Sequence, residues 1–117
     1  MVSKFKKRQK PLVVAMTDGA TITPNVDQGD VFTVTLAGNR NLANPTGTPT
    51  NGQKMMIRFR QDGTGNRTIT HTGSQYRFGT DITGVTLTTT AAKTDYVGYV
   101  YHSADSKWDV IAFVKGY

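Results

Sequence analysis

Two stretches of the chain alternate, residue by residue, between side chains suited to a core and side chains suited to a surface. Of all the features of the sequence, this period of two residues restricts the possible folds most. Residues 31–36 read VFTVTL and residues 54–60 read KMMIRFR. Successive side chains of a strand point to opposite faces of a sheet, so this alternation predicts strands with one buried face. The apolar residues that share a face are Phe32, Val34 and Leu36 in the first stretch and Met55, Ile57 and Phe59 in the second.

Turn signals separate these stretches from further strand candidates. Dipeptides such as Asp18-Gly19 and Asp62-Gly63 are typical of tight turns between strands. No stretch shows convincing helical periodicity, and about eight short strands at regular spacing predict an all-β protein. We expect a single antiparallel β-sandwich or barrel, jelly-roll-like, over residues 12–117, behind an extended N-terminal arm of residues 1–11. The remaining strand candidates are residues 12–16, 20–26, 66–71, 82–88, 95–102 and 107–114.

Two of these candidates are apolar or aromatic on both faces. They are YVGYVY at residues 96–101 and WDVIAFV at residues 108–114. A strand of this kind must be covered on both sides. The second cover is either another subunit or a second layer of the same domain, and the sequence does not separate the two. The candidate subunit-interface residues are Tyr96, Tyr99, Tyr101, Trp108 and Phe113.

Most of the net charge of +6 belongs to the N-terminus. Residues 1–10 hold five of the 14 basic residues and no acid, so nine basic residues face eight acidic ones in the rest of the chain. A nucleic-acid-binding domain usually carries its charge on a folded face, so we do not expect nucleic acid as a partner. The arm suits an acidic protein surface or a solvated tail. Its candidate partner-binding residues are Lys4, Phe5, Lys6, Lys7, Arg8 and Lys10.

Other partners and compartments are restricted by what the sequence lacks. It has no cysteine, which excludes disulfides and thiolate metal sites. No apolar run approaches the roughly 20 residues that span a bilayer, so we expect no membrane association. Residues 12–16 are too short an apolar run for the core of a signal peptide, and we expect a chain made in the cytoplasm.

The segment from Asn39 to Pro49 reads as an ordered irregular loop. Pro45 and Pro49 each disfavour a helix at the preceding residue. Asparagine side chains commonly pair with backbone groups in such loops, and Leu42 is suited to close the end of the sandwich. The predicted structural cap consists of Asn39, Arg40, Leu42, Asn44 and Pro45.

Catalytic and cofactor motifs are missing from the sequence. The two histidines, His71 and His102, lie at predicted strand ends, where a surface position is the usual one. The sequence contains no nucleophile elbow, no zinc-protease motif and no phosphate loop, and Asp27–Asp30 lacks the spacing of a calcium loop. We therefore expect no enzymatic activity, no metal and no cofactor.

Carbohydrate binding stays open beside a purely structural role. Aromatic rings could stack on sugars, and threonine- and asparagine-rich loops could recognise hydroxyl groups. The simpler explanation is that these rings belong to a core or a subunit interface, where Trp and Tyr are also favoured. These aromatic residues are Tyr76, Tyr96, Tyr99, Tyr101, Trp108 and Tyr117.

Three blocks of sequence in order resemble a module of tailed-bacteriophage virion proteins. The module's pattern is T-L-T-G-N-R-T-L-x-N-P, then Q-D-G-T-G-x-R-T-I-T, then L-T-T-A-A-x-x-x-D. The chain reads TLAGNRNLANP at residues 35–45, QDGTGNRTIT at residues 61–70 and LTTTAAKTD at residues 87–95. The likeness covers residues 22–114 and departs from the module at His71, Tyr76 and Arg77.

The resemblance implies a non-enzymatic structural protein of the phage particle. Such modules occur in tail-fibre and tip proteins and in small head decoration proteins, which are commonly trimers. Because this sequence holds only an arm and one module, we expect a capsid decoration (cement) protein. It would bind the major capsid protein on the outer capsid surface as a homotrimer, through the basic arm. The alternative is a tail-fibre or head-fibre tip domain that binds glycans on the host surface.

Overall fold

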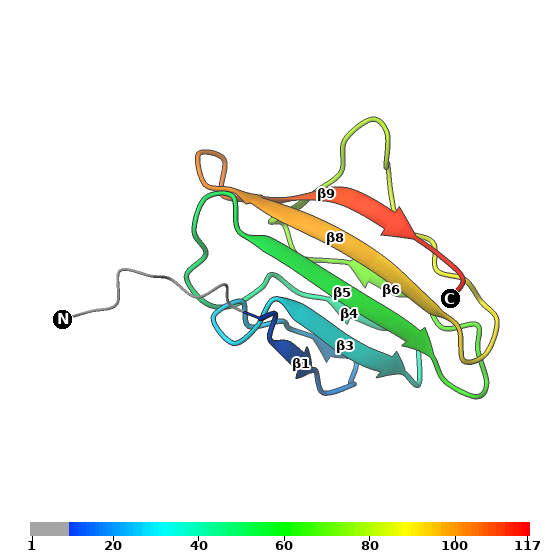
Figure 1. The fold of residues 1–117 in the computed structure, drawn as a ribbon. Helices are drawn as coiled ribbons and strands as arrows, with labels where there is room; N and C mark the ends of the chain where they lie inside the picture. The colour runs from blue at the N-terminus through cyan, green and yellow to red at the C-terminus, as the bar shows by residue number, and fades with distance from the viewer. Residues whose placement is uncertain (1–9) are drawn as a thin grey trace.

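A computed structural model of the chain describes residues 10–117, and its strands form two sheets (Figure 1). The larger sheet has six strands in the order β1-β3-β5-β8-β9-β7, and the smaller has three in the order β2-β4-β6. No helix long and apolar enough to cross a membrane occurs in residues 10–117. The strands are β1 (Val13–Ala15), β2 (Thr21–Ile22), β3 (Val31–Leu36), β4 (Arg40–Leu42), β5 (Lys54–Gln61), β6 (Ile69–His71), β7 (Tyr76–Arg77), β8 (Thr94–His102) and β9 (Lys107–Val114).

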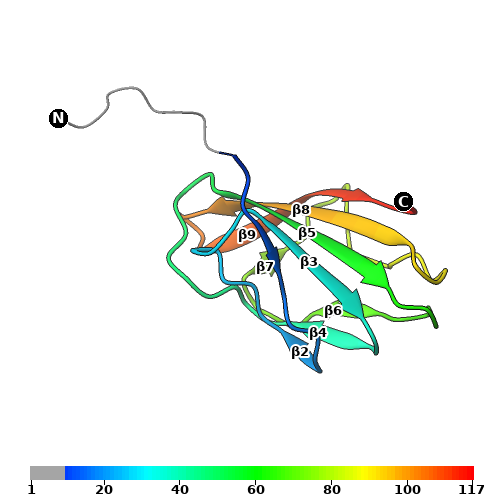
Figure 2. The same ribbon diagram turned by 60° about the horizontal axis from the view of Figure 1, so that its bottom comes forward.

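The first six strands alternate between the two sheets as the chain winds around the core. Strands β1, β3 and β5 lie side by side in the large sheet, and β2, β4 and β6 lie side by side in the small one. Every neighbouring pair in these two groups is parallel. Residues 13–71 therefore make three stacked coils, with one strand of each coil in each layer (Figure 2).

The last two long strands complete the large sheet in a different way. Strand β8 pairs antiparallel with β5, and β9 pairs antiparallel with β8, while the short β7 pairs parallel with β9. The predicted all-β, sandwich-like fold is confirmed. The predicted antiparallel pairing is wrong for the coiled half, because a strand that returns after a full coil runs in the same direction as the strand before it.

The core lies between the two sheets and is built from residues that pair across strands. Phe32 pairs with Ile57 and Ile57 with Val97, so these three fully buried side chains form one row on the inner face of the large sheet. Opposite them, Ile22 and Leu42 are paired residues of the small sheet and are also fully buried. The odd-numbered apolar residues of KMMIRFR thus face inward, as the alternation predicts.

A β-bulge explains why residues 108–114 look apolar on both faces. The pairing of β8 with β9 shifts by one residue between Gly98 and Tyr99, and Ile111 is the extra residue. Trp108 and Val110 are buried before the bulge, and Ile111 is 57% exposed. The shift changes which residues of β9 face inward, as a bulge does. Within residues 10–117 no second layer covers the outer side of this strand.

Three segments differ from the sequence prediction. Strands β4 and β7 were not predicted, and residues 82–88 form no strand. At the end of this segment, buried side chains bond the backbone of Thr88 where a neighbouring strand would otherwise do so. Asp95 Oδ2 accepts the N–H of Thr88 at 2.6 Å, and Gln61 Nε2 donates to the Thr88 carbonyl at 2.8 Å. Gln61 and Asp95 are 2% and 1% exposed, so they anchor this segment from within.

Candidate binding face

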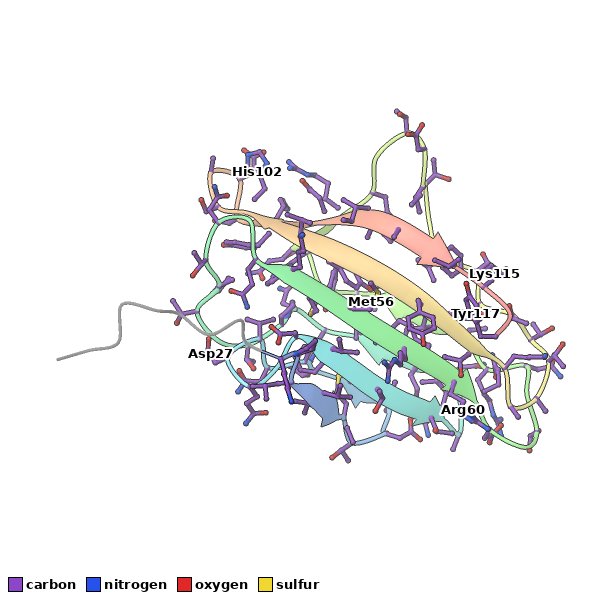
Figure 3. The ribbon with its side chains drawn as sticks, viewed as in Figure 1. Asp27, Met56, Arg60, His102, Lys115 and Tyr117 are labelled. Atoms are coloured by element: carbon purple, nitrogen blue, oxygen red, sulfur yellow. The ribbon has the colours of Figure 1, made fainter. Side chains whose placement is uncertain are left out.

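The side of the six-stranded sheet that faces away from the small sheet is called the outer face below. Residues that pair across strands share a face, so the pairing shows which side chains stand together there. Figure 3 views this face, with Met56, Arg60 and Tyr117 over the large sheet. Three rows of paired residues cross it: Val13, Val31, Met56, Gly98 and Ala112; Ala15, Thr33, Arg58, Tyr96 and Val114; and Thr35, Arg60 and Thr94.

Two arginines of the outer face make no ion pair with any of residues 10–117. Arg58 and Arg60 lie two residues apart on β5 and therefore on the same face. The Nε of Arg58 is buried and has no hydrogen-bond partner in the described part of the chain. Its guanidinium carbon lies 5.6 Å from the centroid of the Tyr96 ring, which is the geometry of a cation–π contact.

The other three arginines of the described chain are held by aspartates. Arg40 donates from Nε and Nη2 to the two carboxylate oxygens of Asp18, at 2.9 Å each. Arg67 makes the same two-pronged contact with Asp62, and this pairing helps to hold the pKa of Asp62 down at about 2. Arg77 is bonded to Asp109 and Asp105. These arginines hold turns and strand ends together.

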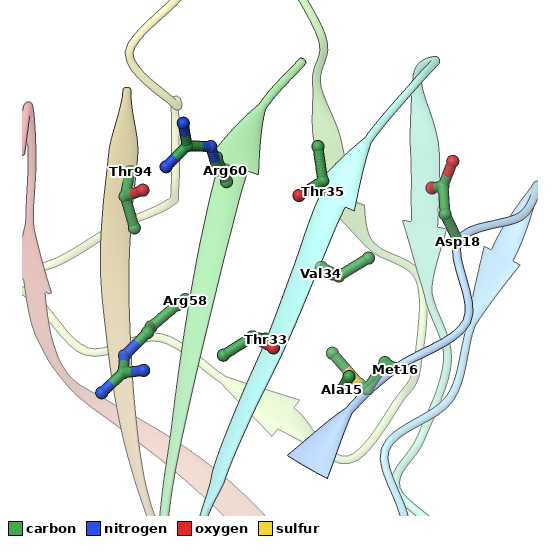
Figure 4. Close-up of a pocket in the computed structure, with 9 residues that line it drawn as sticks. All are labelled: Ala15, Met16, Asp18, Thr33, Val34, Thr35, Arg58, Arg60 and Thr94. Carbon is green, nitrogen blue, oxygen red and sulfur yellow. The ribbon is translucent and has the colours of Figure 1, made fainter. Parts of the chain in front are cut away.

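A groove of about 540 Å³ runs along the outer face beside Arg58 and Arg60 (Figure 4). Strands β3, β5 and β8 supply most of its wall, and the chain leaving β1 closes the other side. Within residues 10–117 the side-chain hydroxyls of Thr33, Thr35 and Thr94 make no hydrogen bond, so they are available to a ligand. The groove, called the arginine–threonine groove below, is lined by Ala15, Met16, Asp18, Thr33, Val34, Thr35, Arg58, Arg60 and Thr94.

Two tyrosines stand next to this groove. Tyr96 and Tyr117 pack edge to face, with ring centroids 5.5 Å apart. The backbone of Tyr117 exchanges two hydrogen bonds with Thr94, of 2.7 and 3.0 Å, which fix it beside β8. The two rings and Met56 line a second hollow of about 400 Å³. Aromatic rings with a polar tip in an open hollow are suited to contact with a sugar.

Gly98 makes the middle of the apolar row a low point on the outer face. A Cβ there would lie 3.3 Å from the Ala112 Cβ and 3.4 Å from the Met56 Cε, so a larger residue would meet both neighbours. The row thus leaves a third, mainly apolar hollow of about 400 Å³ over Met56, Gly98 and Ala112. Exposed Val13 and Ile111 flank it.

The predicted partner-binding arm falls largely outside the described residues. Lys4, Phe5, Lys6, Lys7 and Arg8 precede residue 10, and Lys10 is exposed. The role of the arm stays a prediction.

The structure separates the five candidate interface residues into two groups. Tyr99 and Trp108 are 1% and 0% exposed inside this chain, so the prediction that they meet another subunit is wrong. Both point into the space between the sheets, because β8 and β9 turn these positions inward. Tyr96, Tyr101 and Phe113 are half-buried, and a subunit contact through them stays a prediction.

The predicted cap residues belong to the second coil and not to an end loop. Leu42 is a residue of β4, between Ile22 and His71 in the small sheet, so it is part of the core and does not close the end of the sandwich. Asn39 Oδ1 accepts the N–H of Thr68, and Asn44 Oδ1 accepts the N–H of Gln75. These asparagines bond the backbone of the following coil. Arg40 pairs with Asp18, and half-buried Pro45 follows β4.

The histidines are placed differently from each other. His71, predicted at the surface, packs edge to face against Tyr76 and Phe78, and its Nε2 lies 2.7 Å from the Tyr99 hydroxyl. Burial lowers the pKa of His71 to about 4, so it is neutral near pH 7. His102 is exposed beside Asp105 and Asp109. Within residues 10–117 neither histidine has a serine or threonine hydroxyl as a hydrogen-bond partner, and there is no cluster of three potential metal ligands.

The arginine–threonine groove was missed in the sequence, although part of its signal was present. The polar positions of KMMIRFR already place Arg58 and Arg60 on one face. What separates them from the other arginines is the lack of an aspartate partner. The partners of the other three lie five to 32 residues away in the sequence, so pairing is visible only in the fold.

A family model described as "Putative phage tail fibre C-terminal domain" matches residues 22–102. The matched range runs from β2 to the end of β8 and includes Arg58, Arg60 and the three threonines of the groove. No curated protein and no solved structure matches the chain.

Proposed function

The chain belongs to the phage tail fibre C-terminal domain family, and on that premise we propose that it is a fibre-tip domain that binds glycans on the host surface. Membership makes it a structural component of the phage particle. The family is a structural one, and the proposal assigns no reaction to the chain. Binding takes place on the outer face of the six-stranded sheet.

The observation that carries this proposal is the uncovered outer face with its arginine–threonine groove. Glycan sites need hydrogen-bonding groups of fixed position together with a flat apolar surface. Thr33, Thr35 and Thr94 offer hydroxyls that no other group of residues 10–117 takes up, and they stand on strands with β-branched side chains of few rotamers. Tyr96 and Tyr117 supply the ring surfaces. A groove of about 540 Å³ lies within the usual range of binding pockets.

Capsid decoration remains the competing prediction. It relies on the arm, whose residues Lys4 to Arg8 are outside the described part of the chain, and on a homotrimer. The family match favours the fibre reading over the capsid reading, because the matched family is described by its tail-fibre position.

Cell binding by the purified full-length chain tests the proposal. We expect fluorescently labelled protein to bind cells of the phage's host saturably, and to lose this binding after enzymatic or chemical removal of surface polysaccharide. Immunogold labelling of intact particles gives the control, with gold expected at a fibre end. Gold over the capsid shell, together with no cell binding at micromolar protein, would establish decoration instead.

A further inference from the structure

We propose that the arginine–threonine groove binds a sugar that carries an anionic group, a carboxylate or a phosphate ester, which contacts Arg58 and Arg60. This inference rests on the proposed function, and it names the chemical class of the glycan. Neutral sugars that lack such a group bind the groove weakly.

Arg58 and Arg60 bring two guanidinium groups from one strand to the same groove. Arg58 and Arg60 alternate with inward-facing residues of β5, and a separation of two residues along a strand is about 6.6 Å. In the structure the two side chains point apart along β5 (Figure 4), and both are long enough to turn toward a ligand that lies in the groove between them. Guanidinium groups contact carboxylates and phosphates through paired N–H donors, which makes arginine the residue most suited to these groups.

The charge of both arginines lacks an internal counter-charge. Within residues 10–117 neither makes a salt bridge, whereas Arg40, Arg67 and Arg77 all do. Among residues 10–117 the buried Nε of Arg58 has no acceptor. Buried donors in folded proteins almost always have one. Stacking on Tyr96 orients the Arg58 guanidinium, and its two terminal nitrogens, which are not buried by residues 10–117, are the donors left for an anionic oxygen.

One acidic residue, Asp18, also lines the groove, but its charge is already compensated. Both of its carboxylate oxygens are bonded to Arg40, and one also accepts the N–H of Ala37. This pairing lowers the pKa of Asp18, so the carboxylate stays ionised and held by Arg40. The remaining charges that line the groove are the two positive ones, Arg58 and Arg60.

The groove favours a sugar over an acidic peptide. A peptide usually adds to a sheet through a free edge, where backbone N–H and C=O groups are unpaired. Strands β5 and β8, which carry Arg58, Arg60 and Thr94, each have a neighbour on both sides, so the sheet under the arginines offers no free edge. What it offers is the three threonine hydroxyls and the nearby rings of Tyr96 and Tyr117. Hydroxyl donors and acceptors beside aromatic rings match a sugar ring.

Titration of the ¹⁵N-labelled full-length chain, followed by amide chemical shifts, tests the inference with four probes. The probes are D-glucuronate, D-glucose 6-phosphate, D-glucose and inorganic phosphate. We expect both anionic sugars to shift the amides of Thr33, Arg58 and Thr94. Glucose and inorganic phosphate should each bind at least tenfold more weakly than the better anionic sugar. The two anionic sugars separate a carboxylate ligand from a phosphate-ester ligand.

Single variants on β5 provide a matched comparison. Arg58→Gln and Arg60→Gln should each weaken binding of the better anionic sugar at least fivefold. Lys54→Gln is the control, because it removes one positive charge from the same strand and face but outside the groove, and it should leave binding within twofold. Unchanged amide spectra away from the substituted site confirm that each variant is folded.

Four results would overturn the inference. They are binding of glucose as tight as that of the anionic sugars, equal binding of inorganic phosphate, equal effects of Lys54→Gln and Arg58→Gln, and tighter binding of a tetra-aspartate peptide. If the wild-type chain binds host cells and the Arg58→Gln/Arg60→Gln variant binds them equally well, the inference fails and the fibre-tip proposal stands. If the wild-type chain does not bind host cells, the fibre-tip proposal itself fails.

Discussion

The inner and outer faces of the six-stranded sheet are made by the same strands, yet their side chains are used in opposite ways. On the inner face Ile57 is fully buried between paired apolar residues. On the outer face its neighbour Arg58 lies open to a groove with no charge partner among residues 10–117. One strand therefore carries the stability of the fold on odd-numbered positions and the candidate binding site on even-numbered ones.

The comparison also separates two uses of arginine. Arg40 and Arg67 bridge to aspartates at the corners where the chain passes from one sheet to the other, and there they fix the coils. Arg58 and Arg60 stand in the middle of a sheet that is already held by backbone pairing and by its inner face. A charge that the fold does not use is available for a ligand.

The largest expected effect is a difference in stability between a substitution on the inner face and one on the outer face. Ile57→Ala should lower the free energy of unfolding by about 3 kcal/mol, because it removes a fully buried side chain from the core. Met56→Ala, one residue earlier and on the outer face, should cost less than about 1 kcal/mol. Urea unfolding followed by tryptophan fluorescence measures both, since Trp108 is buried in the core.

The Met56 variant also tests whether another subunit covers the outer face. If Met56→Ala costs as much as Ile57→Ala, the outer face is buried in an assembly and the comparison between the faces breaks down. The homotrimer prediction, with Tyr96 at the contact, would then be favoured over an open groove.

A smaller expected effect is a dependence of stability on pH that comes from His71. This residue belongs to the small sheet and packs against Tyr99 on the inner face of the large sheet. Burial lowers the pKa of His71 to about 4, so below its ordinary value of 6.5 the unfolded chain takes up a proton that the folded chain does not. Stability from this group is present above pH 6.5 and is lost as the pH falls toward 4. Between pH 7.5 and pH 5 the loss is about 2 kcal/mol.

The paired variant His71→Phe/Tyr99→Phe should remove that part of the pH dependence. It deletes both members of the 2.7 Å hydrogen bond, so no buried hydroxyl is left without a partner. Val97→Ala is the control, since it shortens a fully buried side chain that does not titrate: it should lower the free energy of unfolding at every pH and leave the slope of stability against pH unchanged. The free energy of unfolding is measured against pH for the wild type and for the paired variant. Equal slopes between pH 7.5 and pH 5 would contradict the assignment of this pH dependence to His71.

The sequence was sufficient for the strands that follow a clear period. Residues 31–36 and 54–60 were predicted nearly to their ends, because each alternates over six residues or more. Strand β4 was missed because Asn and Pro surround its three residues, and only pairing with β2 and β6 makes it a strand. Residues 82–88 form no strand, and Gln61 and Asp95, which bond the backbone of Thr88, lie outside the segment and give it no local signal.

The alternation could not predict whether neighbouring strands run parallel or antiparallel, and it could not predict which face of the sheet carries the candidate binding site. A period of two shows which side chains share a face, but it does not show which strands are neighbours or whether they are parallel. The same limit applies to the arginines. Whether Arg58 or Arg40 is free depends on an aspartate from another coil, and the fold alone brings Asp18 to Arg40.

The most direct test of the outer face is a footprint of host polysaccharide on the full-length chain. Amide chemical shifts of the ¹⁵N-labelled protein would be followed during titration with surface polysaccharide extracted from the phage's host. The account predicts that shifts cluster on β3, β5 and β8 around Thr33, Arg58 and Tyr96, with the small sheet unaffected. Shifts confined to β2, β4 and β6, or no shifts at saturating polysaccharide, would contradict it.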